Sequence, residues 1–270
     1  MFTDHHEVHV RGVATHVAEA GSGPPIVLLH GNPDTHAVWE PVVAALAPRH
    51  RCIAPDLPGF GGSHAPARFD VSLANQAAWV NGVLDALSLD RVHLVVHDIG
   101  GVYGLAFATE HAARIASLTI TNTVFFADYH WHFWARVWRT PGLGELSMAL
   151  MGASLFARKL RRGSPPKPTP NAHWDYTFAN PETRRMVLRW YRAMNVDLYR
   201  SWEPRMLAAT ASVPRQVLWG DRDEYIPAQF ATRFGAPSVQ RMPDAGHWLM
   251  LQHPARVADA IASLVATSSP

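Results

Sequence analysis

The chain has 270 residues, of which 48% are hydrophobic and 17% are charged, a composition that excludes a disordered protein. This length fits one sizeable hydrophobic core or at most two small ones. The 24 Lys and Arg residues nearly balance the 22 Asp and Glu residues, and no basic run carries interleaved aromatic residues. We therefore expect no nucleic-acid partner. No apolar run approaches the roughly 18 to 20 residues that span a bilayer, so we expect no membrane partner either.

The cysteine content and the N-terminus indicate the compartment. The single cysteine, Cys52, excludes an internal disulfide and fits a reducing environment. The first seven residues are acidic and rich in histidine, without the basic start and apolar stretch of a signal peptide. These features predict a cytoplasmic protein.

Strand-like runs alternate with helical patterns along the chain. The segment from Glu7 to Ala20 alternates in polarity and could form an antiparallel hairpin at a sheet edge. A helix is expected over Ser72 to Leu87, where apolar residues recur at helical spacing. The further strands are expected at 26–30, 51–55, 91–97, 118–122, 215–220 and 238–242. Their continuous apolar character is typical of strands covered by helices on both faces, and so predicts a mostly parallel sheet flanked by helices.

The alternation of strands and helices breaks between about Phe126 and Leu207. This stretch is rich in Trp and Tyr and contains no convincing strand. We interpret it as an inserted helical cap over the carboxyl edge of the sheet, where open α/β folds bind their ligands. The predicted organisation is a core in two parts, 1–126 and 208–270, with a helical cap at 127–207.

One acidic residue stands in a strand-to-helix turn of a type that usually carries a serine. Asp98 follows a predicted strand and precedes Gly100 and Gly101 at a helix start, which is the context of a nucleophile elbow. No Gly-x-Ser-x-Gly motif occurs in the chain. The alternative interpretation is that Asp98 only caps the following helix.

Two later residues favour the catalytic interpretation of Asp98. Asp223 follows a late strand, and His247 lies in a loop after the last strand. The order of nucleophile, acid and histidine is that of α/β-hydrolases. A buried carboxylate beside a histidine fixes its tautomer and lets it act as a general base. Asp221 competes with Asp223 for this role, and the spacing favours Asp223.

Histidines are numerous, and most must be incidental to catalysis. The chain has 16 of them, and two groups stand out: His5, His6 and His9, and the pair His130 and His132. Neither group has a convincing metal-ligand framework. We expect no metal and no cofactor.

Together, these motifs resemble the α/β-hydrolase branch that contains epoxide hydrolases and haloalkane dehalogenases. The matching segments cover almost the whole predicted core: 30–34 with Trp39, 56–63, 97–101, Asp223 and 246–247. The resemblance implies an oxyanion hole made by the backbone N–H groups of Asn32 and Ile99. It also implies attack of a carboxylate on a saturated carbon, giving an alkyl ester that a histidine-activated water hydrolyses. The expected substrates are a small apolar organic molecule and water.

The two chemistries of this branch need different help for the leaving group. A departing halide is stabilised by N–H donors, whereas an epoxide oxygen needs an acidic O–H. Asn32 matches the amide that dehalogenases place after His-Gly, but Ile99 stands where they usually carry Trp. A tryptophan of the cap could compensate, with Trp131, Trp134 and Trp138 as candidates.

A cap motif favours the epoxide. Residues 188–195 resemble the segment in which epoxide hydrolases carry a ring-opening tyrosine, which would be Tyr191. No motif identifies the second tyrosine, for which Tyr129 and Tyr176 are candidates. The alternative interpretation of Tyr191 is a packed aromatic residue on an amphipathic helix. We expect epoxide hydrolysis first and hydrolytic dehalogenation second. A non-catalytic ligand-binding relative ranks third, because all three positions of the catalytic triad are filled. The sequence leaves substrate size, stereopreference and oligomeric state open.

Overall fold

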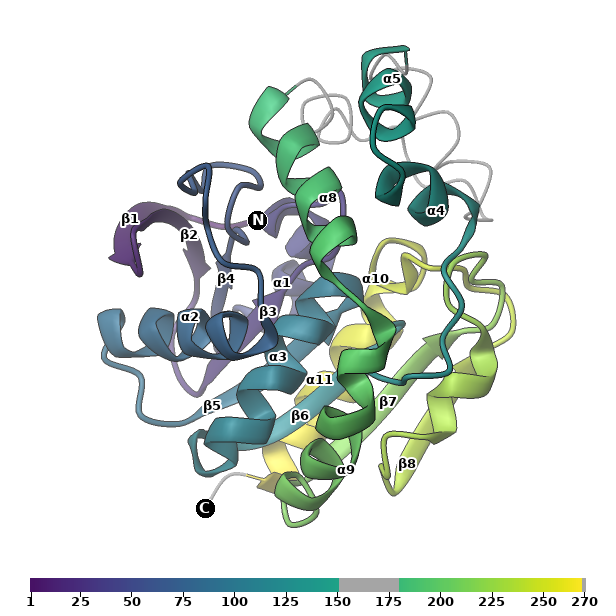
Figure 1. The fold of residues 1–270 in the computed structure, drawn as a ribbon. Coiled ribbons are helices and arrows are strands. Elements are labelled where there is room, and N and C mark those ends of the chain that lie inside the picture. Colours follow the sequence, from purple (N-terminus) through teal and green to yellow (C-terminus); the bar gives the residue numbers. More distant parts are fainter. Residues whose placement is uncertain (151–179, 269–270) are drawn as a thin grey trace.

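The computed structural model describes residues 1–150 and 180–268, and a single eight-stranded sheet organises them (Figure 1). The strand order is β1-β2-β4-β3-β5-β6-β7-β8. The strands are β1 (Asp4–Val10), β2 (Val13–Ala20), β3 (Pro25–Leu29), β4 (Arg51–Pro55), β5 (Val92–His97), β6 (Ile115–Thr121), β7 (Arg215–Gly220) and β8 (Ser238–Met242). The expected strands are confirmed, the last two and β4 with the predicted bounds.

The sheet is parallel except at one edge. β1 pairs antiparallel with β2, and β2 pairs antiparallel with β4. The remaining pairs, from β4 through β3, β5, β6 and β7 to β8, are parallel. The expected edge hairpin is therefore confirmed, although its first strand begins at Asp4. Because parallel strands share a direction, the carboxyl ends of β3, β5, β6 and β7 lie at the same edge of the sheet.

Helices cover both faces of the sheet, which explains the apolar strands. On one face α2 (Leu73–Ala86) packs on α3 (Asp98–His111), and α3 packs on α9 (Tyr199–Ala209); on the other, α1 (Glu40–Leu46) packs on α11 (Pro254–Ser268) (Figure 1). Every residue of β5 and β6 is buried as a result. Burial of each aliphatic side chain contributes about 1.5–3 kcal/mol to the free energy of folding, so the packing of helices on both faces stabilises these two strands.

The helical insertion lies between β6 and β7, as predicted. Its described helices are α4 (Phe133–Arg139), α5 (Leu143–Leu150), α8 (Pro181–Ala193), the short η3 (Val196–Leu198) and α9. α4 packs against both α5 and α8. The boundaries at 126/127 and 207/208, which make this insertion a domain of its own, remain a prediction.

Short helices complete the core, namely η1 (His36–Trp39), η2 (Ala112–Arg114), η4 (Ala228–Thr232) and α10 (Leu249–Gln252). Within the two described ranges, no helix combines the length and apolar character that crossing a membrane requires.

Candidate active site

A sharp turn between β5 and α3 presents Asp98. Its φ is +48°, in the left-handed region that non-glycine residues rarely adopt. A Cβ on Gly100 would collide with the carbonyl oxygen of His30, and one on Gly101 with the hydroxyl of Thr123. Only glycine therefore allows α3 to approach the neighbouring strands this closely. The N-cap position of α3 belongs to His97, not to Asp98.

The Asp98 carboxylate is oriented by backbone donors and a histidine. Its Oδ2 accepts the N–H of Asn32 at 2.7 Å, and the N–H of Ile99 also bonds to the carboxylate. Oδ1 lies 4.0 Å from Nε2 of His247. Burial raises the pKa of Asp98, although His247 and the two N–H groups oppose that shift. One oxygen is thus held in place while the other faces His247.

His247 is itself held by Asp223. Nδ1 of His247 lies 2.7 Å from Oδ2 of Asp223, whose side chain is fully buried. The other oxygen, Oδ1, accepts the N–H groups of Tyr225 and Ile226 at 2.7 and 3.0 Å. Because Nδ1 of His247 donates its hydrogen bond to Asp223, Nε2 is the ring nitrogen that faces Asp98. Burial disfavours the charged imidazole, but Asp223 and then Asp98 outweigh it and raise the pKa of His247 to about 9.

The competing carboxylate lies apart from this arrangement. Asp221 pairs with Arg241 of the neighbouring strand β8. Its backbone N–H donates to the carbonyl of Met242. The carboxylate in contact with His247 is therefore that of Asp223.

Asn122, which was not among the predicted site residues, joins the two halves of the site. It follows β6 with φ +31°. Its side-chain amide donates to Oδ2 of Asp223 at 2.7 Å, and its amide oxygen accepts the N–H of Gly220 at 2.9 Å. Its carbonyl accepts the N–H of Asp98 at 3.2 Å. An amide residue at the end of a predicted strand, at the carboxyl edge of the sheet, is the signal in the sequence that points to it.

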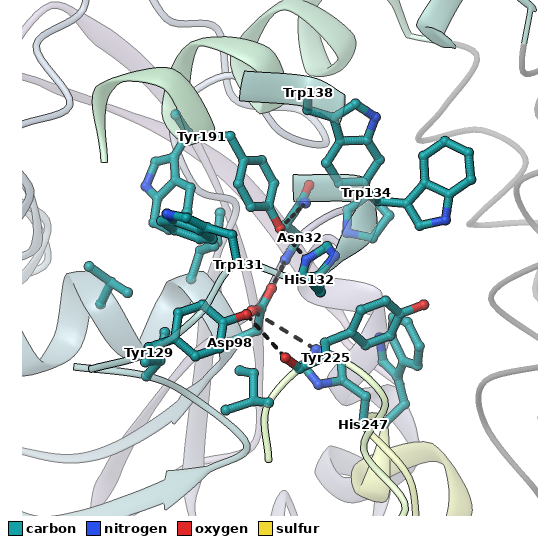
Figure 2. A pocket seen from close by; sticks show the side chains of 17 residues that line it. Asn32, Asp98, Tyr129, Trp131, His132, Trp134, Trp138, Tyr191, Tyr225 and His247 are labelled. Atoms are coloured by element: carbon teal, nitrogen blue, oxygen red, sulfur yellow. Dashed lines mark hydrogen bonds and ion pairs between the residues drawn. The ribbon is translucent and has the colours of Figure 1, made fainter. Parts of the chain in front are cut away.

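An aromatic pocket opens above Asp98, between the sheet and the inserted helices (Figure 2). Seven predicted site residues line it, and so do Trp134 and Trp138. Tyr176 lies outside the described residues. Lining residues that were not predicted are Pro33, Val102, Val124, His132, Trp190, Tyr225, Ile226 and Trp248; those that were are Asn32, Asp98, Ile99, Tyr129, Trp131, Tyr191 and His247. The walls are largely apolar, with a few polar groups near Asp98, as is usual for small-molecule sites.

Helix α8 carries Tyr191 into this pocket. The side chain of Asn180 caps the helix by accepting the N–H of Glu182, and Pro181 occupies its first turn. The helix buries one apolar face, which includes Trp190 and Tyr191. Figure 2 shows the Tyr191 ring pointing down toward Asn32 and Asp98.

Two N–H groups converge on the Tyr191 hydroxyl. Nδ1 of His132 accepts the N–H of Ala135 at the start of α4, so the proton of a neutral ring is on Nε2. Nε2 lies 3.4 Å from the Tyr191 oxygen, and the amide of Asn32 also donates to that oxygen at 3.4 Å. The phenol thus accepts two hydrogen bonds, which leaves its own O–H directed elsewhere. His132 precedes a Trp-rich segment of the sequence, and nothing in that pattern predicts its contact with Tyr191.

Burial keeps both of these groups neutral. It raises the pKa of Tyr191 well above its ordinary value, and the nearby Asp98 adds to the effect. It lowers the pKa of His132 to about 4, with the charge of His247 contributing.

Tyr129 is placed differently from Tyr191. Its hydroxyl donates to the backbone carbonyl of Tyr225 at 3.0 Å. Its ring lies edge-on to Trp131, with the ring centroids 5.3 Å apart. Tyr129 therefore lines the pocket, but its hydroxyl proton is engaged in a hydrogen bond to the backbone.

Comparison with known proteins agrees with this architecture. The sequence pattern of the "alpha/beta hydrolase fold" family matches residues 24–254. Haloalkane dehalogenase 2 of Mycobacterium tuberculosis is 30% identical over 259 residues, which cover 91% of this chain and 89% of the relative. The crystal structure of haloalkane dehalogenase DbeA from Bradyrhizobium elkani is 26% identical, with a TM-score of 0.81 over 98% of this chain and 99% of that one.

An epoxide hydrolase shares the same fold. The structure of epoxide hydrolase CorEH superimposes with a TM-score of 0.79 over 98% of this chain and 99% of that one, at 23% identity. The chain is a hydrolase that belongs to the α/β-hydrolase family; it is related in sequence to haloalkane dehalogenases and shares its fold with an epoxide hydrolase.

Proposed function

We propose that the protein hydrolyses a small apolar epoxide to a diol through an alkyl ester on Asp98. The observation that carries the proposal is the Tyr191 hydroxyl, which lies in the pocket and accepts hydrogen bonds from His132 and Asn32. Its own proton is therefore free to reach the epoxide oxygen. The apolar aromatic walls favour a substrate of the same character.

Ring opening uses Asp98 and Tyr191 together. Oδ1 of Asp98 attacks a ring carbon, the C–O bond breaks, and the epoxide oxygen takes the phenolic proton. The product of this step is a hydroxyalkyl ester and a phenolate. The two N–H groups that bond to the Tyr191 oxygen stabilise that phenolate, because hydrogen bonds to a charged acceptor are the strong ones.

Hydrolysis of the ester uses His247. With a pKa of about 9, the imidazole is protonated in the resting enzyme, so it can return a proton to the phenolate. Ester formation also removes the Asp98 charge that raises this pKa. The neutral ring then takes a proton from water, and the hydroxide attacks the ester carbonyl. The diol leaves, and Asp98 and protonated His247 are regenerated.

The remaining groups stabilise this second step. We assign the oxyanion hole to the backbone N–H groups of Asn32 and Ile99, which already bond to the Asp98 carboxylate. Asp223 rather than Asp221 orients His247, an assignment that the 2.7 Å contact supports. We further propose that 127–207 acts as the cap over a core formed by 1–126 and 208–270.

Hydrolytic dehalogenation is the second candidate. The amide of Asn32 lies at the pocket, and Nε1 of the buried Trp190 has no hydrogen-bond partner among the described residues, so it is an N–H donor that a halide could use. The names of the relatives also favour it. Against it, Ile99 supplies no N–H beyond its backbone at the position next to the nucleophile.

A paired assay on matched carbon skeletons tests the proposal. We would incubate the protein with 1,2-epoxyhexane and with 1-bromohexane, and measure diol by chromatography and bromide by ion chromatography. Asp98→Ala serves as the control for uncatalysed reaction. We expect diol formation to be the faster reaction. Faster bromide release would replace the proposal with dehalogenation.

A further inference from the structure

A histidine cluster lies outside the pocket, where the edge hairpin meets η1. His5 comes from β1, His16 from β2 and His36 from η1. One ring nitrogen from each residue lies within 4.8 Å of the other two. Nδ1 of His5 is 3.2 Å from Nε2 of His16. The sequence grouped His5 with His6 and His9, whereas strand pairing brings it beside His16 instead.

A buried carboxylate orients two of the three rings. Nδ1 of His16 lies 2.9 Å from Oδ2 of Asp56, and Nδ1 of His36 lies 3.0 Å from Oδ1. Asp56 is fully buried and also accepts the N–H groups of His36 and Gly62 at 2.7 and 2.9 Å. Because Nδ1 donates to Asp56 in both rings, their Nε2 atoms carry lone pairs. A carboxylate behind the imidazole is the usual support of a metal-binding histidine.

We propose that His5, His16 and His36 bind a divalent metal ion of the zinc class, with Asp56 as the supporting carboxylate. Three imidazoles suit Zn²⁺ and its neighbours, which bind nitrogen at about 2.0–2.1 Å. Ligand nitrogens of a tetrahedral site are then about 3.4 Å apart. The nitrogens of His5 and His16 are already near that separation, and the exposed His5 side chain can adjust.

Solvent can reach the site. The side chains of His16 and His36 are 22% and 18% exposed, and His5 lies at the surface. An ion bound there would tie both strands of the edge hairpin to η1. The loop that holds Asn32 precedes η1, so the ion would also fix the far end of that loop.

Metal titration of the full chain tests this site independently of its catalytic activity. The protein is purified without a polyhistidine tag, stripped with a chelator and titrated with Zn²⁺ by calorimetry, while thermal unfolding is followed at several Zn²⁺ concentrations. We expect one ion per chain and a melting temperature that rises with Zn²⁺, because a ligand of the folded state stabilises it. Failure of the wild-type protein to bind one ion per chain overturns the proposal.

Variants identify the ligands. His5→Gln is the primary test, because His5 is exposed and does not touch Asp56, so the fold is retained. We expect it to weaken Zn²⁺ binding by about tenfold or more, and His36→Gln to do the same. His9→Gln, an exposed residue on the same strand, is the matched control and should leave binding unchanged. Binding that survives His5→Gln, or that His9→Gln weakens equally, assigns the ion elsewhere and overturns the site.

Discussion

The amide nitrogen of Asn122 and the Nδ1 of His247 both lie 2.7 Å from the same oxygen of Asp223. One oxygen of Asp223 therefore accepts two hydrogen bonds, and the bond from Asn122 fixes the orientation of this carboxylate relative to the His247 imidazole. The backbone carbonyl of Asn122 accepts the N–H of Asp98 as well. This single residue thus sets the position of the nucleophile relative to its base.

Asn122→Gly should slow ester hydrolysis more than ester formation. Glycine tolerates the φ of +31° and keeps the backbone contact to Asp98, while it removes the bond to Asp223. A hydrogen bond to a charged group is worth about 1.5–3 kcal/mol, so hydrolysis should fall roughly 10- to 100-fold. Single-turnover kinetics measure the two steps separately. Equal slowing of both steps would mean that Asn122 has only a structural role.

Tyr191→Phe should slow ring opening about 100-fold or more, because the leaving oxygen loses its proton donor. The rate of ester formation with 1,2-epoxyhexane measures this effect. Tyr199→Phe is the matched control: Tyr199 is buried like Tyr191, its hydroxyl has no hydrogen-bond partner among the described residues, and it does not line the pocket. An unchanged rate in Tyr191→Phe would remove Tyr191 from the mechanism.

His132→Asn separates the two hydrogen bonds of that residue. Asparagine can still cap α4 by accepting the N–H of Ala135, so the melting temperature should not change. It cannot reach the Tyr191 oxygen in place of Nε2, so the phenolate loses one donor. We expect ester formation to slow roughly three- to tenfold. If melting falls and the rate stays the same, His132 acts as a helix cap alone.

The fold could be predicted from the sequence because buried elements require apolar residues, and these form local patterns in the sequence. Strands covered on both faces, such as β5, must be apolar at every position, and that pattern is local. The first residues of β1 were missed because Asp4 and the histidines after it are polar. An edge strand that faces solvent does not need the apolar pattern by which the other strands were recognised.

The site could be predicted only in part, for the same reason. Asp98, Asp223 and His247 each follow a strand at the carboxyl edge, and their order along the chain has a chemical meaning. The contacts of Asn122 with Asp223, and of His132 with Tyr191, join residues far apart in the chain through the packing of loops and inserted helices. Local patterns do not encode such contacts, which is also why His16 and His36 were not grouped with His5.

His247→Gln should trap the alkyl ester, and the pH dependence of trapping reports on Asp98. The variant lacks the base for hydrolysis, so intact-mass spectrometry should show the mass of the epoxide added to the chain, and Asp98→Ala should show no adduct. Attack requires the ionised carboxylate, so the rate of adduct formation should be highest at alkaline pH and fall as the pH drops through the pKa of Asp98. Burial raises that pKa, and loss of the His247 charge, which lowers it, raises it further. The fall should thus occur at a higher pH in His247→Gln than in single-turnover alkylation of the wild-type protein. A fall at the same pH would show that His247 carries no charge beside Asp98 when the nucleophile attacks.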